Sequence, residues 1–169
     1  MNRRHIFLFF VPAVLCMGAI FWFSAQNARI SSDMSGSLIA HVLSRLTPDF
    51  DTLSTVEQAA RISAWQFLVR KSAHFCIYML LGALLSIPYM RYLRRTRAAL
   101  PAAWATALLF AVTDEVHQYF VPGRSCEARD VAIDASGALL GVLLFWLIRG
   151  AALRKPHTAR KKSNNTLDR

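Results

Sequence analysis

Four long apolar segments constrain this chain more than any other feature of its sequence. They cover about residues 6–23, 72–90, 98–118 and 131–148. A helix that crosses a bilayer needs roughly 20 mostly apolar residues, with a range of about 17–25, and each segment reaches that length once its flanks are counted. With 54% hydrophobic and 18% charged residues, the chain has too little polar sequence to coat these segments in water. The sequence therefore predicts an all-α, polytopic membrane protein with four transmembrane helices.

The first apolar segment has some features of a cleaved secretory signal, because Arg3 and Arg4 precede it and small residues follow it. Its uncharged run extends from Ile6 to Phe23, however, whereas the apolar region of a signal peptide usually has about 7–15 residues. We therefore expect it to remain as the first transmembrane helix.

The distribution of lysine and arginine predicts the orientation. Thirteen of these 20 residues lie in the N-terminus, in the 91–97 loop and from Arg149 onward, together with a single acid, Asp168. The opposite side combines seven basic residues with nine acids. Short basic loops stay in the cytoplasm, so both termini are expected there. Because the basic residues are divided among membrane-flanking segments, they indicate contact with the lipid bilayer and no nucleic-acid partner.

The external segment, residues 24–69, is too long to be a structureless loop. Apolar residues at helical spacing after Ser31-Ser32-Asp33 predict a capped amphipathic helix. Ser54-Thr55-Val56-Glu57 has the pattern of a capping box, which begins a helix leading toward the second span. The segment is either a connector or a lid. Residues 1–150 are expected to form one membrane domain, and residues 151–169 a basic, disordered cytoplasmic tail.

Polar residues gather at the ends of three of the predicted spans. Arg70, Lys71 and His74 begin the second span, and a larger cluster joins the third span to the fourth. The cluster comprises Asp114, Glu115, His117, Gln118, Arg124, Asp130 and Asp134. With the topology above, both groups lie at the same depth on the outer side. Ionisable groups in a membrane are costly, so they are usually paired or functional.

The fourth span also carries a stripe of small residues. Gly137 and Gly141 form a G-x-x-x-G pattern, which lets another helix approach closely. We interpret the pattern as helix packing within the bundle, and the alternative is a docking face for a second membrane protein.

Taken together, these motifs resemble those of the VanZ-like family of small bacterial membrane proteins. The resemblance covers about residues 6–149 and rests on the segments Phe23–Gln26, Arg70–Phe75 with Tyr78, Asp114–Gln118, Phe120–Arg124, and Asp130 with Asp134–Gly137 and Gly141. Ile77 departs from the family pattern, in which an acid often precedes the tyrosine, so it supplies no carboxylate to His74 from its own helix. The family is associated with resistance to teicoplanin, a glycopeptide that targets cell-wall precursors. The resemblance implies a bacterial cytoplasmic-membrane protein related to the envelope, and it brings no settled reaction.

Four interpretations of the polar cluster remain open at this point. Ion pairs and hydrogen bonds could simply fix the bundle. Arg70, Lys71 and Arg124 could bind the phosphate of an anionic lipid or cell-wall precursor, because an arginine fork matches phosphate geometry. His74, Glu115 or His117 could serve as an acid or base in hydrolysis or group transfer on a lipid-linked substrate. The chain could also be a small accessory to another membrane protein.

The sequence predicts neither a metal site nor a cofactor. Two histidines and several acids occur in the cluster, and imidazole and carboxylate groups are metal ligands. They lie on separate predicted helices without the short spacing of a ligand motif. The three cysteines, Cys16, Cys76 and Cys126, are equally scattered.

Overall fold

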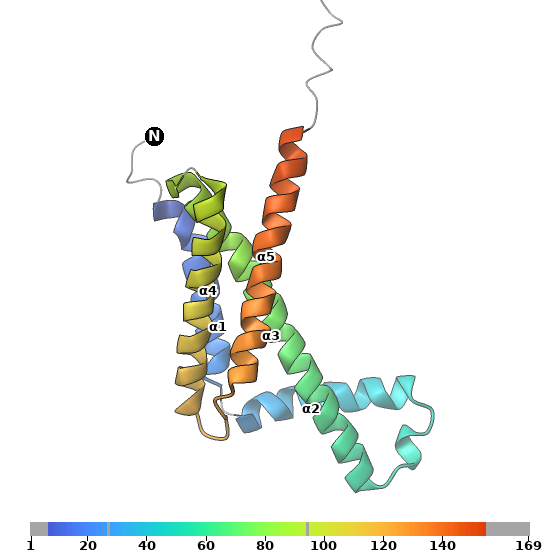
Figure 1. Cartoon of the computed structure of the whole chain (residues 1–169). Coiled ribbons are helices and arrows are strands. Elements are labelled where there is room, and N and C mark those ends of the chain that lie inside the picture. Colours follow the sequence, from blue (N-terminus) through green and yellow to red (C-terminus); the bar gives the residue numbers. More distant parts are fainter. Residues whose placement is uncertain (1–6, 27, 94, 155–169) are drawn as a thin grey trace, which may run out of the picture.

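Helices form all of the regular structure in the described part of the chain (Figure 1). This computed structural model describes residues 7–26, 28–93 and 95–154, and of residues 28–35 and 154 only the backbone. The elements in order are η2 (Phe7–Phe10), α1 (Val11–Ser24), α2 (Ala28–Leu46), η3 (Phe50–Thr52), α3 (Thr55–Leu93), α4 (Thr96–Tyr119) and α5 (Ala128–Arg154). The predicted all-α class is confirmed.

Four segments of the structure are long and apolar enough to cross a membrane: Phe7–Ser24, Thr55–Leu93, Thr96–Tyr119 and Ala128–Leu153. They coincide with the four predicted spans. Large apolar side chains point outward from them; Trp22, Leu109 and Ile148 are each more than 65% exposed. In a bilayer these side chains meet lipid, which requires no polar coat.

Small side chains bring the spans together. On α4, Ala99, Ala103, Ala107 and Ala111 recur every fourth residue and are fully buried, so one face of this helix fits closely against its neighbours. The core between the spans is completed by α3, α5 and α1, which contribute Tyr78, Leu81, Leu85, Ala138, Val142, Ala13 and Ile20.

Helix α3 is much longer than a span requires. Its 39 residues extend about 58 Å at about 1.5 Å per residue, whereas the hydrocarbon core is about 30 Å thick. Its N-terminal part projects beyond the bundle, where α2 crosses it (Figure 1). The predicted capping box is present: the Ser54 amide donates to Glu57 Oε2 at 3.0 Å, and the Glu57 amide donates to Ser54 Oγ at 3.3 Å.

Two boundaries differ from the sequence prediction. Helix α2 begins at Ala28, before the expected cap at Ser31–Asp33, because alanine and arginine are good helix formers. Helix α5 continues to Arg154, four residues past the expected end of the membrane domain at residue 150. The predicted disorder of the remaining tail and the basic residues Arg3 and Arg4 lie outside the described residues.

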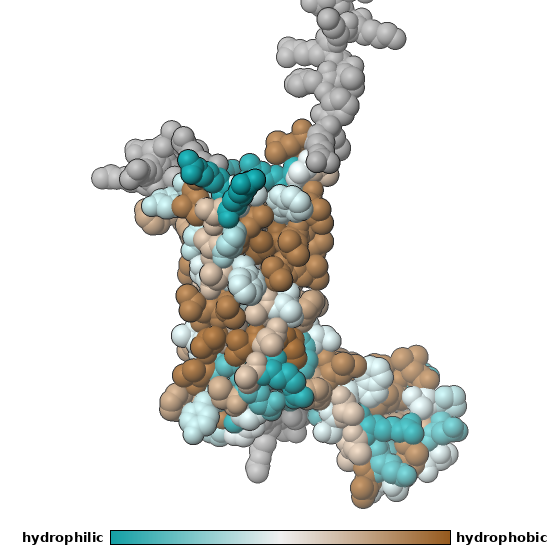
Figure 2. Space-filling model, viewed as in Figure 1, coloured by the Kyte–Doolittle hydropathy of each residue, from teal (hydrophilic) through white to brown (hydrophobic). Residues whose placement is uncertain are grey.

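The ends of the bundle are polar and its middle is apolar (Figure 2). One end holds the start of η2, the junction between α3 and α4, and the end of α5 (Figure 1). The opposite end holds the end of α1, the end of α4 and the start of α5. The predicted polar residues lie at this second end, which is also the side from which the α2–α3 arm projects.

Candidate functional site

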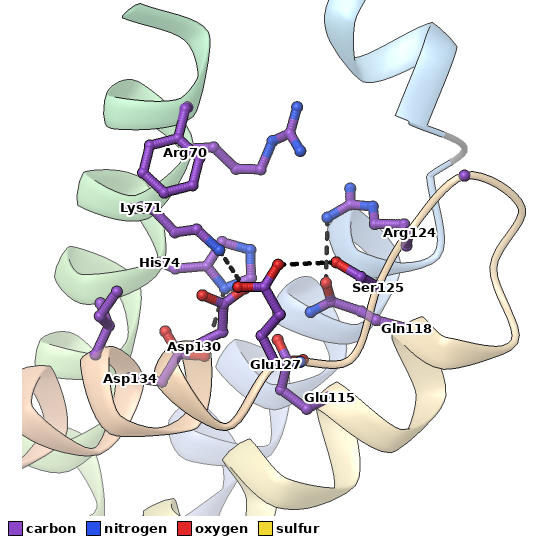
Figure 3. Close-up of a pocket in the computed structure, with 13 residues that line it drawn as sticks. Arg70, Lys71, His74, Glu115, Gln118, Arg124, Ser125, Glu127, Asp130 and Asp134 are labelled. Carbon is purple, nitrogen blue, oxygen red and sulfur yellow. Dashed lines mark hydrogen bonds and ion pairs between the residues drawn. The ribbon is translucent and has the colours of Figure 1, made fainter. Parts of the chain in front are cut away.

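A tight turn after α4 positions the mouth of the site. Val121, Pro122 and Gly123 follow the helix, and the Arg124 amide donates to Val121 O at 3.1 Å. Gly123 has a φ of 79°, in the left-handed region that favours glycine. The turn directs Arg124 back over the end of the bundle (Figure 3).

Beneath this turn lies a polar cavity of about 240 Å³ between α3, α4, α5 and the 120–127 loop. Nearly all of the predicted polar residues come together around it (Figure 3). Its charged and polar lining consists of Arg70, Lys71, His74, Glu115, Gln118, Arg124, Ser125, Glu127, Asp130 and Asp134, with Phe67 and Ile133 as apolar neighbours. Helices far apart in sequence thus build one site.

Two pairs of side chains connect α3 to α5 at the cavity. The Lys71 ammonium contacts the Asp130 carboxylate, and His74 Nδ1 lies 3.6 Å from Asp134 Oδ2. The spacing of 3 residues on α3 and 4 on α5 places both members on one face of each helix. His74 thus obtains from another helix the carboxylate that Ile77 does not supply on its own.

A second network joins α1 to α4. Asp114 is completely buried, and its Oδ2 accepts hydrogen bonds from Ser24 Oγ at 2.8 Å and from Gln118 Nε2 at 3.1 Å. Sequence reasoning did not identify Ser24 as a site residue, although it lies in one of the segments that resemble the VanZ-like family.

Arg124 ties the loop to both neighbouring elements. Its Nε and Nη2 each donate to Gln26 O at 3.3 Å, and its Nη1 donates to Gln118 Oε1 at 3.3 Å. Burial lowers the pKa of the Arg124 guanidinium below its ordinary value, and the nearby Arg70 lowers it further. An arginine nevertheless remains charged in a protein, so this part of the mouth carries a positive charge that favours an anion.

Glu115 is 2% exposed, and its Oε2 accepts a hydrogen bond from the Glu127 amide at 3.0 Å. One oxygen of this predicted acid or base therefore holds the loop in place while the residue lines the cavity.

His117, the other predicted acid or base, does not join the site. Its ring stacks on Phe21 of α1 with 4.0 Å between ring centroids, and it is not among the residues around the cavity. It lies three residues from Asp114, close to one helical turn, and both side chains reach α1, but the ring meets Phe21 whereas the carboxylate meets Ser24. Sequence spacing alone could not separate these two directions.

Gly137 and Gly141 pack against the backbone of α3. A Cβ atom added at either glycine would lie under 3.0 Å from a carbonyl oxygen, that of Phe75 or of Met79. Gly82 of α3 meets Ala138 of α5 in the same way. Since α3 occupies this face, the stripe is not free to dock a second membrane protein.

The three polar side chains His74, Asp114 and Asp134 also come close enough to share a metal ion, since one ligand atom from each lies within 4.8 Å of the others. They come from α3, α4 and α5, so no spacing along the sequence indicates this arrangement.

Comparison with known proteins gives one match. The family model described as VanZ/LLP1 matches residues 9–149, which include nearly all of the four spans and every residue around the cavity. Neither the curated proteins nor the solved structures contain a match.

Proposed function

The chain belongs to the VanZ/LLP1 family, and from that premise we propose that this membrane protein binds a phosphate-bearing anionic lipid or lipid-linked cell-wall precursor in the cavity at the polar end of its bundle. One observation carries the proposal: Arg70 and Arg124, from different elements, line the same mouth. Like charges repel, so an anion between two guanidinium groups stabilises this arrangement.

The pairing of the other cations supports this choice. Lys71, which the sequence grouped with the two arginines, is engaged by Asp130. Arg70 makes no ion pair or hydrogen bond with any residue that the structure describes. Arg124 contacts a carbonyl and an amide oxygen, and no carboxylate. The two arginines thus keep the charge that a phosphate group needs.

The dimensions and position of the cavity suit a headgroup. Sites that bury a whole drug-sized ligand occupy about 300–1,000 Å³, and this cavity measures about 240 Å³. It lies at one end of a bundle whose middle is apolar (Figure 2), where the acyl or prenyl chains of a lipid would remain in the bilayer. The headgroup could then enter the cavity from the interface.

We further propose that the cavity faces outward from the bacterial cytoplasmic membrane, with both termini in the cytoplasm. The basic end of the bundle carries Arg91, Arg95, Arg97 and Arg149, which the positive-inside rule places in the cytoplasm. Cys126, an exposed residue of the 120–127 loop, provides the test. A membrane-impermeant thiol reagent should label it in intact spheroplasts and should not label the Cys126→Ser variant. Labelling that requires lysis would reverse the orientation.

The binding proposal is tested by mass spectrometry of the lipids that co-purify with the protein in a mild detergent. Arg124→Gln and Arg70→Gln should each lose the phosphate-bearing lipid. Arg129→Gln is the matched control, because Arg129 has a 61% exposed side chain, pairs with Glu127 and does not line the cavity. Equal lipid content in wild type and Arg124→Gln would overturn the proposal.

A role in resistance to teicoplanin-type glycopeptides extends this proposal, because such drugs act on cell-wall precursors. It predicts that a host lacking the protein becomes more susceptible, and that wild type, but not Arg124→Gln, restores resistance at equal membrane abundance. Unchanged susceptibility would remove the resistance role and leave the lipid site untouched.

The alternative that the cavity favours is an enzyme, because His74 and Glu115 line it together. A histidine and a buried carboxylate beside a bound phosphate ester are suited to acid–base hydrolysis or group transfer. Incubation with lipid-linked precursors should then produce a new species by mass spectrometry, and His74→Gln should abolish it. Precursors that bind and stay intact would leave a binding protein.

A further inference from the structure

The floor of the cavity holds a set of potential metal ligands that neither the family match nor the proposed function explains. His74 of α3, Asp114 of α4 and Asp134 of α5 each present one ligand atom, and these atoms lie within 4.8 Å of one another. The two carboxylates are 0% and 1% exposed. His74 and Asp134 also line the cavity, so the group connects to the space where a ligand would enter.

Buried oxygens in this group lack partners. Asp114 Oδ1 and Asp134 Oδ2 have no hydrogen-bond partner among the described residues, although His74 Nδ1 faces Asp134 Oδ2 at 3.6 Å. Tyr78 is fully buried, and its hydroxyl interacts with the Asp114 carboxylate. An unpaired buried polar group costs about 1–3 kcal/mol, and native structures leave few of them. Two such carboxylate oxygens close together indicate a ligand that both of them would bind.

Asp114 is held in the manner of a metal ligand. Ser24 and Gln118 both donate to its Oδ2, which orients the carboxylate and leaves Oδ1 directed away from these donors. Carboxylates that bind metal ions are commonly fixed by such outer hydrogen bonds.

The charge around the cavity points to a cation at its floor. Four carboxylates (Asp114, Glu115, Asp130 and Asp134) face three permanent cations (Arg70, Lys71 and Arg124) in the cavity and its floor, while the fifth acid, Glu127, pairs with Arg129 outside the cavity. Uncompensated carboxylates are costly among apolar helices. A divalent ion would balance the excess, whereas a further anion alone would increase it.

We propose that His74, Asp114 and Asp134 bind one divalent transition-metal ion, with Zn²⁺ or Mn²⁺ as the best match. An imidazole combined with two carboxylates favours these ions over Mg²⁺ and Ca²⁺, which prefer oxygen ligands alone. Bonds of about 2.0–2.2 Å place tetrahedral ligand atoms about 3.4 Å apart. Small side-chain rotations are therefore sufficient to close the site, and three protein ligands leave one position open toward the cavity.

The role of this ion in ligand binding rests on the proposed function. A metal at the floor, together with Arg70 and Arg124 at the mouth, would turn an acid-rich cavity into a phosphate site. A phosphate oxygen could occupy the open coordination position while the two arginines contact the remaining oxygens. Lipid binding should then weaken when the metal is removed.

The metal site is tested on the full-length chain, purified in detergent without added phospholipid and stripped with a chelator. After dialysis against Zn²⁺ or Mn²⁺, elemental analysis should find one ion per chain. Asp134→Asn and Asp114→Asn should lose it, whereas Glu127→Gln should retain it, because that change removes a charge from the same cavity without touching the three ligands. Ser24→Ala, which removes only a hydrogen bond to Asp114, should bind about 10–100-fold more weakly.

Folded wild-type protein that holds no stoichiometric ion would overturn the proposal, and the acids would then share protons instead. Metal retention by a folded Asp134→Asn variant would overturn it equally. The lipid measurements are separate. Metal without lipid would remove the proposed function and leave the metal site. Lipid binding by a protein that holds no metal would remove the metal site and leave the proposed function. If lipid binding survived removal of a bound ion, the metal would not take part in binding the lipid phosphate.

Discussion

Helices α3 and α5 meet along one interface whose two halves are built on different principles. In the packing half, defined by Gly82, Gly137 and Gly141, the helix backbones touch and the space for a Cβ atom is already filled. In the cavity half, defined by Lys71, His74, Asp130 and Asp134, paired polar side chains connect the two helices and line the cavity.

The difference separates stability from function along a single pair of helices. Close backbone contact excludes lipid and has one geometry, so it can set the crossing of α3 and α5. The cavity half contains unpaired buried oxygens on Asp130 and Asp134, which are a cost to the fold. Proteins accept such costs mainly where a site requires them. We therefore expect removal of an unpaired acid in the cavity half to change stability in the opposite direction to overpacking of the packing half.

The largest effect is expected from Gly141→Ala. Its Cβ would overlap the Met79 carbonyl oxygen, and two helix backbones would have to separate. Overpacking a core usually costs about 1–3 kcal/mol, and we expect more than about 3 kcal/mol because no flexible side chain can move aside. The midpoint of reversible unfolding in mixed micelles measures this loss. A wild-type midpoint would show that close contact does not hold the packing half together.

Lys71→Met should have the next largest effect. It leaves the Asp130 carboxylate, whose side chain is 14% exposed, without its cation. Exposed ion pairs contribute at most about 1 kcal/mol and fully buried ones about 3–5 kcal/mol when one partner is removed. This partly buried pair should lose about 1–3 kcal/mol.

The double variant Lys71→Met/Asp130→Asn is the matched control, and it should recover most of that stability in the same unfolding assay. A double variant as unstable as Lys71→Met would mean that the ammonium stabilises through its contact with the Phe67 ring, 5.3 Å from the ring centroid, and not through Asp130.

Asp134→Asn should raise the free energy of unfolding, whereas the two preceding substitutions lower it. In metal-free protein it removes a buried charge whose Oδ2 faces His74 Nδ1 at 3.6 Å, which is longer than a hydrogen bond, and the new amide could donate to the free oxygen of Asp114. We expect a gain of about 1 kcal/mol. Zn²⁺ at about 100 times its dissociation constant should add about 2.7 kcal/mol to wild type and nothing to this variant. If the metal-free variant were less stable than wild type, Asp134 would stabilise the fold in the same way as the residues of the packing half.

The overall topology was accessible from sequence because it depends on composition over long windows. Four apolar segments, the capping box at Ser54–Glu57 and the turn before Arg124 each follow from local patterns, and the structure contains all of them. The glycine spacing likewise anticipated a close helix contact. Its partner, α3, could not be named because nothing in the α5 sequence specifies which helix lies opposite.

The detailed site was less accessible because it depends on how helices rotate against one another. The sequence grouped His117 with Asp114, but the structure stacks the histidine on Phe21 and turns the acid toward Ser24. A metal site was not predicted because His74, Asp114 and Asp134 are widely separated in sequence. Only the tertiary packing of α3, α4 and α5 brings their ligand atoms together.

The smallest predicted effect separates close packing from helix propensity. Gly150 lies on the same helix as Gly141, and a Cβ atom added there meets nothing within 4 Å. Alanine should therefore act only through the backbone, where it favours a helix over glycine by about 0.5–1 kcal/mol. The unfolding midpoint of Gly150→Ala should rise slightly, opposite to that of Gly141→Ala. If both variants lost stability, glycine would stabilise α5 even where it makes no contact with α3. Backbone contact alone would then not define the packing half.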